Sequence, residues 1–364
     1  MNKKCRVLAL YLPQFHPTPE NDEWWGEGFT EWNSVVKARP LFKGHQQPKL
    51  PGKLGFYDLR LPETRVAQAE LARDAGVEGF CYWHYWFGNG KRLLERPFNE
   101  VLESGSPDFP FCLAWANHSW YKKLWDPKAP NKDVLLIEQT YPGVEDYIAH
   151  FYAVLPAFKD HRYVKVDGKP FFMVFKPLQI KNVELFIKTW QDLAKENGLP
   201  GIYFVGQCDR HQINDVLNAG FDAVNHEEVN HIHEKEPIIK KAIQQILLRS
   251  VKIPRIYDYS KAMKSMMIVE DKELNVFPTI CPNFDHSPRS GARGLVFTGV
   301  TPEKFAEHVS ATLEIVKDKP DEQKIIILKS WNEWGEGNYM EPDEQNGKGY
   351  IEAMRRAIDE FDKK

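Results

Sequence analysis

The sequence lacks several features that would by themselves assign a class of function. Its five cysteines are scattered and no Cys-x-x-Cys pair occurs, which argues against a zinc site and against a disulfide framework. No apolar run approaches the ~18 residues that a membrane-spanning helix needs. The formal net charge is only −3, so the chain has no general attraction for nucleic acid. We expect reduced cysteines and no nucleic-acid partner.

Motifs for nucleotide binding and for serine nucleophiles are also missing. Neither GxGxxG nor GxxxxGK[ST] occurs, there is no DxD-like metal motif, and no GxSxG elbow is present. The basic start leads into an apolar run that ends at Pro13 without a small-residue cleavage site, which predicts a first strand and not a signal peptide. The expectation is a cytoplasmic protein without a cofactor.

Short apolar segments alternate with longer helical patterns along the chain. The expected strands are 5–12, 77–85, 110–117, 170–175, 201–207, 221–225, 276–282 and 324–330. The expected helices are 62–75, 92–104, 144–158, 181–198, 211–219, 236–250, 302–317 and 346–361. Strict alternation over eight units predicts an α/β fold, a single (β/α)8 TIM barrel over residues 1–364, with long βα loops on the C-terminal face. A doubly wound open sheet is the alternative, but it would want a glycine-rich phosphate loop.

The stretch SWNEWGEG at 330–337 places two glutamates three residues apart, directly after the last expected strand. Gly335 and Gly337 oppose a continuous helix here, so Glu333 and Glu336 are expected in a loop at the mouth of the barrel. Two carboxyl groups, one protonated and one charged, are the usual machinery of glycosyl transfer. Two solvated loop glutamates would be the ordinary alternative, although such loops seldom carry flanking tryptophans.

Aromatic and polar residues gather near other expected strand ends and in the long segment 13–61. The 11 tryptophans suit sugar rings, which stack on aromatic faces, or simply a large aromatic core. The candidate substrate-binding residues are Tyr11, Gln14, Trp24, Trp25, Glu31, Trp32, Tyr82, His84, Tyr85, Trp86, Trp115, Asn117, Trp331, Asn332 and Trp334. The loop after the seventh strand adds Asn283, Asp285 and Arg289. Each residue alone fits a core or loop role, but together they predict a carbohydrate cleft.

Two further segments have competing interpretations. His226, Glu227 and Glu228 begin the cluster NHEEVNHIHE, which favours a polar loop lining the cleft over a divalent-metal site, because the spacing is not HExxH. The stretch 235–266 is basic and apolar. It is typical of a solvated helix pair, and it also suits contact with anionic lipid, an acidic glycan or a polysaccharide-assembly partner.

Long motifs of the chain resemble a known family. The segments YLPQFHPTPENDEWWGEGFTEWNSV, LGFYDLR, GFCYWHYWFGNGKRLLE, PDFPFCLAWAN and SWNEWGEGNYMEP look like WbsX-type proteins, which are similar to family-99 glycoside hydrolases, the endo-α-mannosidases. The resemblance covers almost the whole chain. It implies a (β/α)8 barrel, no metal, retention at the anomeric carbon, and an oligosaccharide or polysaccharide substrate in surface polysaccharide (O-antigen, lipopolysaccharide or capsule) metabolism.

The resemblance also implies a role for each glutamate. Glu333 would be the base that deprotonates the 2-hydroxyl of the sugar, which attacks C1 and forms a 1,2-anhydro sugar. Glu336 would be the acid for the leaving oxygen and later the base for the acceptor. Hydrolysis and transfer both stay open, since WbsX-type proteins are labelled glycosyltransferases and their relatives are hydrolases. A non-catalytic glycan-binding or scaffold barrel in polysaccharide assembly is the alternative from another class.

Overall fold

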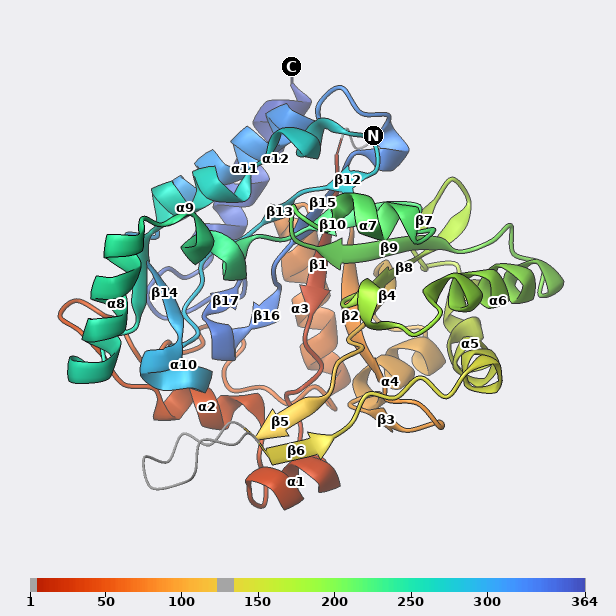
Figure 1. Cartoon of the computed structure of the whole chain (residues 1–364), viewed down its shortest axis with the longest axis horizontal. Coiled ribbons are helices and arrows are strands. Elements are labelled where there is room, and N and C mark those ends of the chain that lie inside the picture. Colours follow the sequence, from red (N-terminus) through yellow and green to blue (C-terminus); the bar gives the residue numbers. More distant parts are fainter. Residues whose placement is uncertain (1–4, 123–133, 364) are drawn as a thin grey trace.

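The computed structural model describes residues 5–122 and 134–363, and its centre is a parallel barrel (Figure 1). The barrel strands, in chain order, are β1 (Arg6–Tyr11), β2 (Gly79–Trp86), β4 (Phe111–Trp115), β8 (Lys169–Val174), β9 (Tyr203–Cys208), β10 (Ala223–His226), β12 (Val276–Phe277), β13 (Thr279–Ile280) and β15 (Ile325–Leu328). Their order in the sheet is β12-β10-β9-β8-β4-β2-β1-β15-β13, and every pair along it is parallel.

The two ends of this sheet meet at Pro278. β12 pairs with β10 and β13 pairs with β15, and only Pro278 separates β12 from β13. The proline has no N–H to donate, but its carbonyl accepts a 3.0 Å hydrogen bond from Ile327 N. β12 and β13 therefore act as one strand that changes neighbour, which confirms the predicted (β/α)8 barrel and its eight expected strands.

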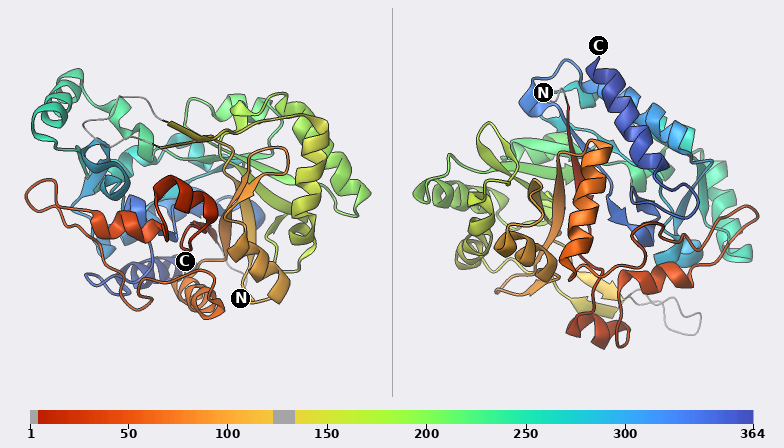
Figure 2. Two further views of the ribbon diagram at one scale, coloured as in Figure 1. Left: turned by 90° about the horizontal axis from the view of Figure 1, so that it is seen from below. Right: turned by 180° about the vertical axis from the view of Figure 1, so that it is seen from behind.

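Seven of the eight expected helices cover the barrel. They are α3 (Pro62–Ala75), α4 (Arg96–Ser104), α5 (Val144–Lys159), α6 (Val183–Glu196), α7 (Ile213–Asn218), α11 (Pro302–Val316) and α12 (Gly349–Asp362). Local signals fix where they start: Thr301 accepts from Lys304 N at the start of α11, where Pro302 is the first helical residue. α12 packs between α3 and α11, so the last helix closes the outer ring beside the first (Figure 2). Among the described helices, none has the length and apolar character needed to cross a bilayer.

The remaining expected helix, at 236–250, exists but does not cover the barrel. α8 (Ile238–Val251) has no buried residue and belongs to a long crossover with β11 (Arg255–Asp258) and α9 (Tyr259–Met266). β11 pairs in parallel with β14 (Leu295–Thr298), outside the barrel. A second apolar cluster, which includes Tyr259, Met263, Phe284 and Phe297, fills the space beneath this pair. The prediction of a helix at 236–250 is right, and its place in the helical ring is wrong.

Loops and short elements gather at one end of the barrel. The segment 13–61, expected to lack helices, contains α1 (Pro19–Trp25) and α2 (Glu31–Lys37), each preceded by a capping threonine. With α10 (Ser287–Ser290), β5 (Trp120–Lys122) and β6 (Val134–Ile137), they lie at the end toward which β1 runs, at the lower edge of Figure 1. The remaining short strands are β3 (Arg92–Leu93), β7 (Lys165–Val166), β16 (Asn332–Glu333) and β17 (Asn338–Tyr339).

Short 3-10 turns complete the chain. They are η1 (Pro177–Gln179), η2 (Val229–Lys235), η3 (Val269–Lys272), η4 (Gly291–Arg293), η5 (Asp321–Gln323) and η6 (Trp334–Glu336). η2 follows the end of β10, and η6 follows β16, so both lie on the loop-bearing end of the barrel.

Candidate active site

The two glutamates lie in a small turn structure after the last barrel strand. Glu333 ends β16, which pairs antiparallel with β17, and Glu336 ends the 3-10 turn η6 between them. Asn332 fixes this turn to the first strand, because its side chain accepts from Leu12 N at 2.8 Å and donates to Leu12 O at 3.0 Å. The turn is thus held against the mouth of the barrel by the end of β1.

One guanidinium joins both glutamates. Arg289 of α10 donates from Nη2 to Glu333 Oε1 at 2.5 Å and from Nη1 to Glu336 Oε1 at 2.9 Å. Its Nε donates to Glu31 Oε1 at 2.7 Å. A side chain at Gly335 would overlap the Glu31 carboxylate, so glycine is needed for this close approach. Loops one, seven and eight of the barrel therefore converge on a single charged centre.

The charges around the pair separate the pKa values of its two members. Burial raises the pKa of Glu333 to about 7; Arg289 opposes this shift, and Glu336 and Glu31 add to it. Burial would also raise the pKa of Glu336, but His286, Arg289 and Lys329 together hold it well below its usual range. The difference has a simple cause, since three basic side chains act on Glu336 and Arg289 alone bonds Glu333. These charges favour a proton on Glu333 over a proton on Glu336.

Lys329 connects this centre to a fourth carboxylate. Its Nζ lies 3.3 Å from Glu227 Oε2, at the end of the sixth strand. Burial alone would lower the pKa of Lys329, but Glu227 and Glu336 raise it to about 12. Lys329 is therefore a permanent cation in the floor of the site.

A cavity of about 280 Å³ opens beside the two glutamates. Its wall is formed by Leu10, Leu12, Gln14, Trp83, Tyr85, Ala116, His118, Trp120, Phe175, Gln207, Arg289, Lys329, Ser330, Glu333, Glu336 and Asn338. Four ring systems, those of Trp83, Tyr85, Trp120 and Phe175, give it apolar faces next to the carboxyl groups. This combination of rings, carboxyl groups and amides suits a sugar.

The cavity continues on both sides. A space of about 410 Å³ shares Phe175 and Gln207 with it and reaches Lys176, Glu227 and His231. Another of about 400 Å³ shares Gln14 and Arg289 with it and reaches Trp25, Phe29 and Tyr121. The three neighbouring spaces are together called the groove, and the glutamates line its central cavity.

Several of the residues predicted from the sequence lie in this groove. Gln14, Tyr85, Glu333 and Glu336 line the central cavity, and Trp25 and Glu31 line the adjoining one. Trp24 does not line it but packs edge-on against Trp120, with ring centroids 6.0 Å apart. The sequence order alone does not show this convergence, because the residues come from four separate loops.

The other predicted residues are buried away from the wall of the groove. They are Tyr11, Trp32, Tyr82, His84, Trp86, Trp115, Asn117, Trp331, Asn332 and Trp334. Trp334, for example, lies between the two glutamates in sequence, yet its ring stacks on Tyr339 and its Nε1 donates to Glu341 at 2.7 Å. Because these side chains are buried outside the walls of the three spaces, the prediction that they contact substrate directly is corrected.

Strand alternation explains most of these misplacements. In β2 successive side chains point to opposite faces, so Trp83 and Tyr85 reach the cavity while His84 and Trp86 turn outward to His150 of α5. From the sequence, Tyr82, His84, Tyr85 and Trp86 of this strand are predicted as one binding surface. That prediction did not separate the two faces, and it left out Trp83. The period-two rule applied from Tyr85 would have found it.

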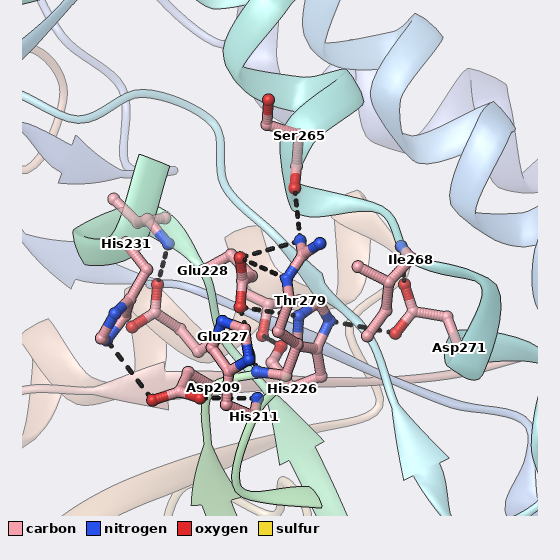
Figure 3. A network of polar contacts seen from close by, with 12 residues as sticks. Asp209, His211, His226, Glu227, Glu228, His231, Ser265, Ile268, Asp271 and Thr279 are labelled. Carbon is pink, nitrogen blue, oxygen red and sulfur yellow. Dashed lines mark hydrogen bonds and ion pairs between the residues drawn. The ribbon is translucent and has the colours of Figure 1, made fainter. Parts of the chain in front are cut away.

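The polar cluster after β10 forms an ion-pair network of its own (Figure 3). His226 lies between two carboxylates, with Nδ1 3.1 Å from Asp271 Oδ1 and Nε2 3.4 Å from Glu228 Oε1. Arg210 donates to Glu228 at 3.0 Å and to the carbonyl of Ser265 at 3.2 Å. In the described part of the chain, no group of three histidine, cysteine or acidic side chains is arranged to hold a metal ion. Glu227 and His231 line the groove, and independence from metals stays a prediction.

Comparison with known sequences places the chain in one family. The family model described as glycosyltransferase WbsX matches residues 7–354. The chain is 33% identical over 357 residues to the uncharacterized protein WxcX of Xanthomonas campestris pv. campestris strain B100, covering 97% of this chain and 49% of that protein. A second strain of the same organism has an equally similar WxcX. The chain thus spans about half the length of the curated relatives it matches.

Solved structures show the same fold at low sequence identity. A GH99 endo-alpha-mannosidase from Bacteroides thetaiotaomicron, in complex with bis-tris-propane, is similar with a TM-score of 0.60 and 15% identity over 98% of this chain and 97% of that one. A glycoside hydrolase-like protein is similar with a TM-score of 0.62 and 14% identity over 98% and 94% of the two chains. At these identities the likeness establishes the architecture.

Proposed function

The chain belongs to the WbsX glycosyltransferase family, and from this membership and the groove we propose that it is a carbohydrate-active enzyme of surface polysaccharide metabolism. We propose that it cleaves or transfers an α-linked, mannose-like glycosyl unit of an O-antigen, lipopolysaccharide or capsule, with retention and without a metal. The observation that carries the proposal is the buried pair Glu333 and Glu336, bonded to one guanidinium at the wall of a ring-lined cavity.

The proposed chemistry uses a hydroxyl of the sugar itself. The base takes the proton of the 2-hydroxyl, whose oxygen attacks C1 while the acid protonates the departing glycosidic oxygen. The acid, now charged, then takes a proton from water or an acceptor hydroxyl, which attacks C1. The bond from C1 to O2 breaks, and O2 regains its proton from the former base. Two inversions at C1 give net retention. O2 recovers its proton from the base, and the acid replaces the proton that it gave to the departing oxygen with one from the water or the acceptor.

The charged side chains around the two glutamates bear directly on which one acts as the acid and which as the base. The family resemblance implies that Glu333 is the base and Glu336 the acid, and we adopt these roles. The pKa of about 7 for Glu333 and the depressed pKa of Glu336 favour the opposite resting distribution. The scheme therefore requires the shared proton to pass from Glu333 to Glu336 when a sugar binds. Both carboxylates contact Arg289, so a sugar that changes the position of this guanidinium changes both pKa values together.

The shape of the groove supports a substrate of several sugar units. The adjoining spaces of about 410 and 400 Å³ lie on opposite sides of the central cavity and share different wall residues with it. A chain of sugars could occupy both while its linkage lies next to the glutamates. We propose binding within an oligosaccharide or polysaccharide.

The test of this function is the loss of activity in single-atom variants. On a panel of α-linked oligosaccharides that includes mannosides, Glu333→Gln and Glu336→Gln should each lower turnover by about 10²–10⁴-fold. Glu344→Gln changes an exposed glutamate a few residues further on and should leave turnover unchanged. Melting temperatures of all three should stay close to wild type. Full turnover in either site variant would refute the paired-carboxylate scheme.

A glycosyl fluoride separates the acid from the base. Fluoride leaves without a proton, so Glu336→Gln should retain most of its fluoride release while Glu333→Gln should not. A 2-deoxy fluoride should fail with the wild type, because it lacks the attacking hydroxyl. If Glu333→Gln released fluoride and Glu336→Gln did not, Glu333 would be the acid and Glu336 the base. That assignment would agree with the directions of their pKa shifts in the structure without substrate.

A non-catalytic glycan-binding or scaffold barrel is the competing function. It would use the rings of the groove and would not need a carboxyl pair that holds one proton. Glycan binding that is equal in the wild type and both Gln variants, with no turnover on any member of the panel, would favour it. Cytoplasmic localisation stays a prediction from the sequence.

A further inference from the structure

Helix α8 differs from every other α-helix in the described part of the chain. None of its 14 residues is buried, whereas each of the others buries at least one. Ile238, Ile239, Ile243 and Ile246 are 84, 76, 51 and 63% exposed. A helix of this length is marginal in water without an apolar face packed against something. The exposed isoleucines therefore call for a covering surface.

The polar side of α8 faces the protein and its apolar side faces outward. Gln244 accepts from Tyr257 OH at 3.4 Å, and Lys240 Nζ lies 5.3 Å from the centre of the same ring. At 100° per residue, Ile239, Ile243 and Ile246 fall on one face, turned about 100° or more from Gln244. This is the reverse of a helix that packs on a core. Figures 1 and 2 show α8 at the periphery, with no other element over its outer side.

The charge of α8 and the residues that follow it indicates which kind of surface could cover the helix. Residues 237–257 contain Lys240, Lys241, Arg249, Lys252 and Arg255 and no acidic residue, although Glu236, just before them, pairs with Lys240. A second copy of α8 would bring these positive charges together, while an anionic lipid surface complements them, at about fivefold in affinity for each basic residue near the surface. Fourteen residues span about 21 Å, which is too short for the ~30 Å of a bilayer core.

We propose that α8 is an interfacial helix that docks this protein on an anionic lipid surface. The isoleucine face, made of Ile239, Ile243 and Ile246, enters the boundary between headgroups and acyl chains, and the exposed Arg249 and Lys252 lie among the headgroups. The helix lies in the plane of the membrane and does not cross it. This proposal is independent of the catalytic one, because α8 contributes no residue to the central cavity.

The test is vesicle flotation of the full chain. Wild type should float with phosphatidylcholine vesicles that contain phosphatidylglycerol and stay behind with phosphatidylcholine alone, and high salt should weaken binding. Ile243→Ser/Ile246→Ser should lower partitioning by at least ~10-fold. Arg249→Gln/Lys252→Gln should lower it by about 20-fold. Val144→Ser/Leu185→Ser, which changes two 40%-exposed apolar residues elsewhere, is the matched control and should bind like wild type.

Three results would overturn the proposal. The first is that wild type does not float with the anionic vesicles. The second is that Ile243→Ser/Ile246→Ser binds the vesicles as tightly as wild type. The third is that wild type is a dimer in light scattering and the same double change makes it a monomer. Ile243→Trp adds a direct readout, because the emission that this variant gains over wild type should shift to the blue only with anionic vesicles. Turnover of an oligosaccharide in solution should be equal in the wild type and the α8 variants. Loss of flotation is thereby separated from any failure of catalysis.

Discussion

At the scale of single residues, the site depends on the planar fork of Arg289. Its three nitrogens each bond a different carboxylate, those of Glu31, Glu333 and Glu336. A lysine has the same charge but no fixed fork, so it cannot hold three acceptors in one geometry. The arginine therefore positions the acids as well as neutralising them.

We expect Arg289→Lys to lower turnover by about 10²-fold or more while changing the melting temperature by only a few degrees. The two glutamates would lose their common partner, and the pH dependence of turnover would change with it. Arg60→Lys makes the same exchange at an exposed pair with Asp58 and should leave turnover and its pH profile unchanged. Wild-type kinetics in Arg289→Lys would show that charge alone suffices.

At the scale of elements, the positions of the strands could be predicted from the sequence. Which side chains of each strand point into the cavity could be predicted only in part. All eight expected strands exist because short apolar runs bounded by turn residues carry that signal locally. Side chains of β2 alternate between the cavity and the outer face of the barrel, so every second aromatic residue faces the cavity. The sequence does not say which of the two sets this is unless one inward-facing residue is already known. The meeting of Glu31, Arg289 and Glu336 could not be predicted, because it depends on three loops whose paths no local pattern determines. α1 and α2 were readable from Thr18-Pro19 and Thr30, and were missed.

The end of β10 carries a prediction about stability and pH. His226 is 1% exposed between Asp271 and Glu228; burial opposes its protonation, but these two carboxylates raise its pKa to about 9. Because the folded pKa lies above the ordinary 6.5, its stabilisation is complete below pH ~6.5 and is lost as the pH rises through about 9. His226→Gln should lower the free energy of unfolding at pH 6.5 by about 3–5 kcal/mol.

Urea titrations at several pH values check this. The difference between wild type and His226→Gln should shrink between pH 7 and pH 9.5. His161→Gln removes an exposed histidine and should reproduce the wild-type curve throughout. A difference that does not vary with pH would assign the effect to packing.

At the scale of the whole molecule, the groove predicts how activity depends on substrate length. Trp25 lies in the space beyond Arg289 and contributes nothing to the wall of the central cavity. Trp25→Ala should lower kcat/KM by about 10-fold for long oligosaccharides, through the lost stacking, and leave the shortest substrate unaffected. Tyr152→Ala removes a 48%-exposed ring on α5 and is the control. An equal loss at every substrate length would mean that Trp25 acts on the central cavity and not on a distal sugar.

The closure of the barrel has a consequence for how this protein is made. β1 pairs with β15, Trp331 N donates to Leu10 O, and Arg289 bonds acids from positions 31, 333 and 336. A ribosome-bound chain that has emerged only as far as β14 has the guanidinium of Arg289 and the carboxylate of Glu31 but neither Glu333 nor Glu336. In such a chain β1 also lacks β15, the strand with which it pairs in the finished barrel. The proposed chemistry therefore starts only after the newest segment has joined the oldest.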